Sequence, residues 1–83
     1  MIMSVRETIF DEFRRVAANQ NKILAPLTDD LPLHNSGLDS LCFAILVARL
    51  EDITGSDPLS SGAGAHVPRT IGEFIGLYEE ALA

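Results

Sequence analysis

Residues 36–41 read Ser-Gly-Leu-Asp-Ser-Leu, and this short stretch decides how the chain is organised. Gly37 marks the end of a loop, because glycine adopts turn conformations that other residues avoid. Asp39 and Ser40 are residue types that commonly begin a helix, since their side-chain oxygens bond the unpaired N–H groups of the first turn. An apolar run follows directly. The stretch therefore predicts a helix beginning at Asp39 or Ser40, with the Ser40 hydroxyl at its electropositive end.

This predicted helix runs to about Thr54, and Gly55 ends it. At helical spacing its apolar residues fall on two faces. One face holds Phe43, Leu46, Val47 and Leu50. The opposite face holds Leu41, Ile45 and Ala48, with Asp52 among them and Arg49 and Glu51 at its flanks. Because a helix in a small bundle needs only one apolar face, we expect the second face to be covered by another element or to bind a partner.

Two further helices are predicted, one from about Ser4 to Ala18 and one beginning after Thr70. Each starts with the spacing of a capping box, in which a hydroxyl and a glutamate satisfy two backbone N–H groups. The apolar positions of these two helices are Val5, Ile9, Phe13 and Val16, and then Ile71, Phe74, Tyr78 and Leu82. The charged residues Asp11, Glu12, Arg14 and Arg15 are expected mostly on the other side of the first helix.

A long connection, residues 19–38, joins the first two helices and is rich in turn-forming residues. We expect Leu24, Leu27, Leu31 and Leu33 to hold it against the core. Residues 56–69 are rich in glycine, serine and proline, which disfavours a stable helix there. The sequence thus predicts a single domain, residues 1–83, of the all-α class. It would be a small three- to four-helix bundle with a long loop between helices one and two.

Composition excludes several functions. The net charge of −6 argues against nucleic acid, whose phosphates need a cationic surface. No apolar run approaches the roughly 20 residues that span a bilayer. The N-terminus has no secretory pattern, so cytoplasm is the expected location. One cysteine and two scattered histidines give no metal-ligand spacing, so no metal is expected.

The acidity is concentrated in the middle of the chain. Residues 28–57 contain six acidic residues and one arginine. A field of that sign would attract basic partners. An acidic surface that only keeps a small protein soluble is the other interpretation of the same charges.

The segment Gly37-Leu38-Asp39-Ser40-Leu41 resembles the phosphopantetheine attachment motif of the acyl carrier protein family. The resemblance covers nearly the whole chain, including the order of helices and the long loop. It implies that a phosphopantetheinyl transferase attaches a 4'-phosphopantetheine arm to Ser40. The thiol of this arm would carry acyl groups as thioesters between enzymes of fatty acid, polyketide or related biosynthesis. It also implies that Asp39 contacts the transferase and that the protein is a monomer and not an enzyme.

In this family, partner enzymes dock on the second helix. On that resemblance the docking residues are Leu41, Ile45, Ala48, Arg49, Glu51 and Asp52, and the partners are acyl ligases, synthases or transferases. Cys42, Ile45 and Arg49 stand on a helix where carriers of fatty acid synthesis generally have more acids. This favours a specialised stand-alone carrier. The short third helix of the family would lie near residues 58–68.

Three other interpretations remain open at this stage. The cargo could be aminoacyl or peptidyl, although Leu38-Asp39-Ser40-Leu41 and the acidity favour acyl. The chain could also be an interaction module in which Ser40 is unmodified. A hydrolase is disfavoured, because no Gly-x-Ser-x-Gly elbow surrounds Ser40. Cys42 is interpreted as a small apolar helix residue, and His34 and His66 as surface residues or local hydrogen-bonding groups.

Overall fold

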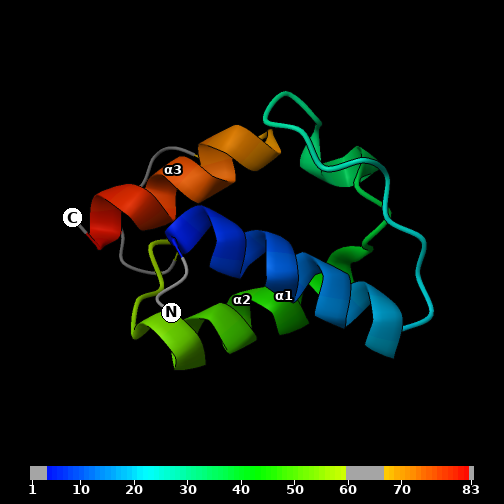
Figure 1. Ribbon diagram of the computed structural model, residues 1–83, viewed down its shortest axis with the longest axis horizontal. Coiled ribbons are helices and arrows are strands. Elements are labelled where there is room, and N and C mark those ends of the chain that lie inside the picture. The colour runs from blue at the N-terminus through cyan, green and yellow to red at the C-terminus, as the bar shows by residue number, and fades with distance from the viewer. Residues whose placement is uncertain (1–3, 60–66, 83) are drawn as a thin grey trace.

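The computed structural model in Figure 1 describes residues 4–59 and 67–82. Its elements in chain order are helix α1 (Val5–Asn19), the 3-10 turn η1 (Leu33–Asn35), helix α2 (Ser40–Thr54) and helix α3 (Ile71–Ala81). The described residues contain no extended strand, only an isolated bridge between Pro32 and Thr70. The predicted all-α bundle with a long loop between the first two helices is confirmed.

Local capping fixes where the helices begin and end. Ser4 forms a complete capping box with Glu7 at the start of α1. The Thr70 hydroxyl accepts from the N–H of Glu73 at 3.2 Å, whereas the Glu73 carboxylate accepts from Arg69, one residue before the cap. Gly55 ends α2 with a φ of 74°, in the left-handed region that glycine adopts readily. The predicted boundaries therefore agree with the structure to within about one residue.

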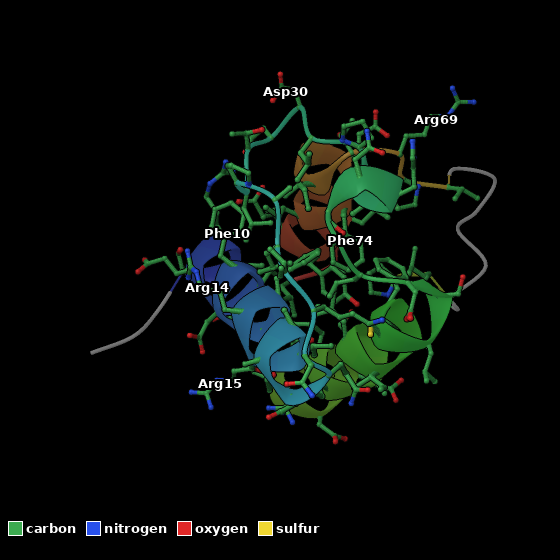
Figure 2. The ribbon with its side chains drawn as sticks, turned by 90° about the vertical axis from the view of Figure 1, so that its right-hand side faces the viewer. Phe10, Arg14, Arg15, Asp30, Arg69 and Phe74 are labelled. Atoms are coloured by element: carbon green, nitrogen blue, oxygen red, sulfur yellow. The ribbon has the colours of Figure 1, made fainter. Side chains whose placement is uncertain are left out.

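Helix α1 lies between α2 and α3 and packs against both (Figure 1). The buried core takes residues from all three helices, with Leu38 added from the loop: Ile9, Phe13, Val16, Ala17, Leu38, Cys42, Leu46, Leu50, Ile71, Phe74, Ile75 and Tyr78. Phe74 lies in the interior, whereas Arg14 and Arg15 point outward from α1 (Figure 2). Cys42 is 1% exposed, as expected for a small apolar helix residue. The core therefore holds both α2 and α3 against α1.

The long loop is anchored to the start of α3. The N–H of Leu33 donates to the carbonyl of Arg69 at 2.8 Å, and the N–H of Ile71 donates to the carbonyl of Leu31 at 3.0 Å. As predicted, Leu24, Leu27, Leu31 and Leu33 pack against the core. These contacts fix the path of the chain that enters α2.

Glu12 corrects one sequence-based expectation. Predicted on the solvent side of α1, it is only 2% exposed. Its Oε1 accepts from Arg49 Nε of α2 at 2.7 Å, and its Oε2 lies 3.4 Å from Arg15 Nε. Helical spacing did not reveal this burial, because the partner of Glu12 comes from another helix. The carboxylate is tolerated there because it is paired.

The short helix expected near residues 58–68 falls mainly on residues 60–66, outside the described residues. His66 is among them.

Candidate functional site

Ser40 is the first residue of α2, and its side chain is exposed. Asp39 caps the helix, and its Oδ1 accepts from the N–H of Cys42 at 2.8 Å. The cap leaves the Ser40 hydroxyl at the electropositive end of a helix of 15 residues. A phosphate ester formed on this oxygen would lie where backbone N–H groups favour negative charge.

Asp39 is held by a second contact. Its Oδ2 lies 3.2 Å from Nζ of Lys22, in the loop after α1. The hydrogen bond from the Cys42 backbone and the nearby Lys22 ammonium lower the pKa of Asp39 to about 2. The carboxylate is therefore ionised at neutral pH, and Lys22 partly offsets its charge beside Ser40.

Acid should weaken the start of α2. Because the folded-state pKa of Asp39 is depressed, its contribution to stability is full above its ordinary pKa near 4 and is lost as pH falls toward 2. Asp39→Asn keeps an oxygen that can cap but has no charge to protonate. We expect this variant to lose less thermal stability than wild type between pH 4 and pH 2, measured by circular dichroism. Equal losses would contradict the assignment.

Gly37 lets the segment before Ser40 pass close to the backbone of Ile23. It has a φ of 105°, and a Cβ at this position would overlap the carbonyl oxygen of Ile23. The neighbouring Ser36 is 1% exposed; its carbonyl accepts from Ala25 N–H at 2.9 Å, and its hydroxyl donates to the Leu33 carbonyl at 2.7 Å. The segment before Ser40 is therefore packed and hydrogen-bonded rather than a free loop.

A surface pocket of about 450 Å³ lies beside Ser40. Its lining residues are Leu33, His34, Leu38, Asp39, Ser40 and Phe43. Phe43 is half-buried, and its ring centroid lies 5.2 Å from that of Phe74 in the core. The pocket therefore combines a hydroxyl and a carboxylate at its rim with apolar side chains that continue into the interior.

The structure brings the predicted docking residues together only in part. Leu41 is 66% exposed, and Ala48, Glu51 and Asp52 are also exposed. Ile45, predicted to face outward, is half-buried and packs against the core. Arg49 is partly buried and bonded to Glu12. The exposed part of the predicted face is therefore narrower and more acidic than the sequence indicated.

Ile23 is an exposed residue near the site that the sequence did not single out. It is 89% exposed and follows Lys22, and its carbonyl lies against Gly37. Sequence patterns gave little reason to choose it, because it stands in an irregular loop without periodicity. An apolar residue directly after the polar stretch Asn19-Gln20-Asn21-Lys22 was the only local signal.

Comparison of the chain with protein-family models, with curated proteins and with solved structures found no match. Among the described residues, no helix combines the length and apolar character needed to cross a membrane. Residues 4–59 and 67–82 also contain no group of three or more His, Cys, Asp or Glu side chains placed to hold a metal ion.

Proposed function

We propose that the protein is an acyl carrier whose Ser40 accepts a 4'-phosphopantetheine arm. The observation that carries the proposal is the placement of Ser40. Its side chain is exposed at the first position of α2 and lies beside a pocket of about 450 Å³. The turn at Gly37, which packs against Ile23, comes just before it in the chain. A hydroxyl in this position is accessible to a modifying enzyme, and its phosphate ester would be stabilised by the helix terminus.

The modification is a phosphoryl-group transfer performed by a separate transferase. Oγ of Ser40 forms a phosphoester bond to the pantetheine-bearing phosphorus of coenzyme A, and the pyrophosphate bond breaks. The adenosine bisphosphate half leaves, and a base of the transferase takes the serine proton. The arm, once bound, supplies a thiol for thioester formation. This chain would present the cargo without catalysing a reaction on it.

The residues around Ser40 fit such an arm. Asp39 is fixed by Cys42 N–H and by Lys22, so it offers a rigid negative group to a basic transferase. The charge of Lys22 also limits repulsion between that carboxylate and the incoming phosphate. The apolar side of the pocket, including Leu38 and Phe43, would shield the non-polar parts of the arm from water.

Partner docking is proposed on the exposed start of α2. Leu41 offers apolar contact, and Glu51 and Asp52 supply negative charge farther along the helix. Ile23, on the loop that passes Gly37, offers a second exposed apolar side chain. The small number of exposed acids on α2 favours a specialised acyl carrier with dedicated ligase, synthase or transferase partners over a general fatty acid carrier.

Intact-mass measurement tests the proposal. After incubation with coenzyme A and a promiscuous phosphopantetheinyl transferase, wild type should gain the mass of one arm, and Ser40→Ala should gain none. Ser60→Ala is a matched control that should be modified like wild type. No gain on wild type, or an equal gain on Ser40→Ala, would defeat the carrier proposal and favour an unmodified interaction module.

A further inference from the structure

The hydroxyl of Tyr78 is buried without a hydrogen-bond partner. The side chain of Tyr78 is 0% exposed, and its Oη contacts no donor or acceptor within the described part of the chain. Buried polar atoms in folded proteins are nearly always paired, because an unpaired one loses its bonds to water. A phenylalanine at this position would fill the same space without that penalty. The hydroxyl therefore calls for a functional explanation.

Tyr78 stands at the far end of a row of aromatic rings that begins at the pocket beside Ser40. Phe43 lines that pocket, and its ring centroid lies 5.2 Å from that of Phe74. The Phe74 ring in turn lies 5.1 Å from that of Tyr78. Phe74 occupies the interior between the helices in Figure 2. The ring contacts therefore lead from the pocket beside Ser40, through the buried Phe74, to the ring that bears the buried hydroxyl.

Tyr78 lies toward the C-terminal end of α3, which is on the same side of the molecule as the C-terminal end of α2 (Figure 1). Burial, followed by the negative charges of Asp57 and Glu51, raises the pKa of Tyr78 to about 12, so the phenol keeps its proton. Glu51 is 11 residues after Ser40 in α2, which corresponds to about 16 Å along the helix axis. The hydroxyl is thus a neutral donor placed well away from Ser40.

The aromatic row bridges α2 and α3, the two helices whose backbones make the least contact. Helix α1 makes extensive contact with both α2 and α3, whereas α2 and α3 approach each other much less closely. Side chains such as Phe43 and Phe74 bridge them instead. A chain inserted here would have to displace these side chains, but not helix backbone in direct contact.

We propose that Tyr78 recognises an oxygen atom on the distal part of the acyl cargo. This inference rests on the proposed carrier function and deepens it. An acyl chain entering beside Ser40 would lie along Phe43 and Phe74, and the Tyr78 hydroxyl would donate a hydrogen bond to a hydroxyl or keto oxygen on it. The cargo class is therefore an oxygenated acyl chain rather than a plain alkyl chain.

A double-mutant cycle between protein and cargo tests this proposal. Wild type and Tyr78→Phe are loaded from the corresponding acyl-coenzyme A with hexanoyl, octanoyl and decanoyl chains and with their terminally hydroxylated counterparts. Thermal unfolding is then measured for each loaded protein. For at least one chain length, the terminal hydroxyl should raise the Tm of wild type by roughly 4 °C or more. On Tyr78→Phe the same hydroxyl should lower the Tm, because the buried oxygen has no partner there.

Each outcome decides the matter. No mass gain on loading overturns the carrier function and this inference with it. A mass gain with the same hydroxyl effect in wild type and Tyr78→Phe, at every chain length, overturns the inference alone. A second measurement uses wild type only: cross-relaxation between the Tyr78 ring protons and the hydroxyl-bearing methylene of the cargo should be observed. Its absence for every hydroxylated chain also counts against the inference. The protein contains one tyrosine, so the ring signals are unambiguous.

Discussion

Gly37→Ala is expected to lower the free energy of unfolding by about 3 kcal/mol. One part of this loss is conformational, because a φ of 105° is strained for any residue with a Cβ. The other part is steric, since the new methyl group would overlap the Ile23 carbonyl oxygen, which belongs to the backbone and cannot rotate away. For a domain of this size the Tm should fall by roughly 12 °C or more. Urea unfolding followed by circular dichroism measures the loss directly.

Gly55→Ala is the matched control. Gly55 also has a positive φ, 74°, but no heavy atom lies within 4 Å of the position its Cβ would take. Its substitution should therefore cost only the conformational part, about 1 kcal/mol. If the two variants lose the same stability, the close approach between Gly37 and Ile23 is not what makes glycine necessary before Ser40.

The helix boundaries could be predicted from the sequence because they are determined locally. Ser4, Asp39 and Thr70 cap backbone groups within three residues, and Gly55 ends α2 through its own conformation. Such signals do not depend on which elements pack together. The position of Ser40 at a helix start followed from the same logic.

The surroundings of the site could not be predicted in the same way. The sequence indicated a turn at Gly37. The contact of Gly37 with the Ile23 backbone, however, depends on how residues 19–38 fold back, which the sequence did not show. Periodicity placed Ile45 on the outer face of α2, yet the neighbouring elements cover part of that face and leave Ile45 half-buried. The side of a helix on which a residue lies follows from its sequence position. How much of that side the neighbouring elements cover does not.

Glu12 shows the same limit for a charged residue. Sequence patterns place acids on solvent faces, because unpaired burial of a charge is costly. Its partner Arg49 is 37 residues away in sequence, so no local spacing links the two. The contact also removes Arg49 from the set of freely accessible docking groups on α2.

Arg49→Met is expected to lower the free energy of unfolding by about 2 kcal/mol. The substitution leaves the Glu12 carboxylate, whose side chain is 3% exposed, without its bond at 2.7 Å. Removing one partner of a fully buried pair typically costs 3–5 kcal/mol. A smaller loss is expected here for two reasons. The Arg49 side chain is 41% exposed, and Arg15 Nε remains 3.4 Å from Glu12.

Two variants separate the ion pair from simple packing. Glu12→Leu combined with Arg49→Met removes both charges, so it should recover most of the stability that Arg49→Met loses, because no uncompensated carboxylate stays buried. Arg15→Met removes the exposed partner of the same carboxylate and should change stability little.

Denaturant midpoints of wild type, Arg49→Met, Arg15→Met and the double variant give the comparison. If the double variant is less stable than Arg49→Met, the Glu12 carboxylate that remains in Arg49→Met is not a destabilising unpaired charge, and the explanation is wrong. If Arg15→Met costs as much as Arg49→Met, the buried charge is shared equally between the two arginines. The recovery in the double variant is the decisive result, since only an unpaired buried charge predicts that a second substitution repairs the first.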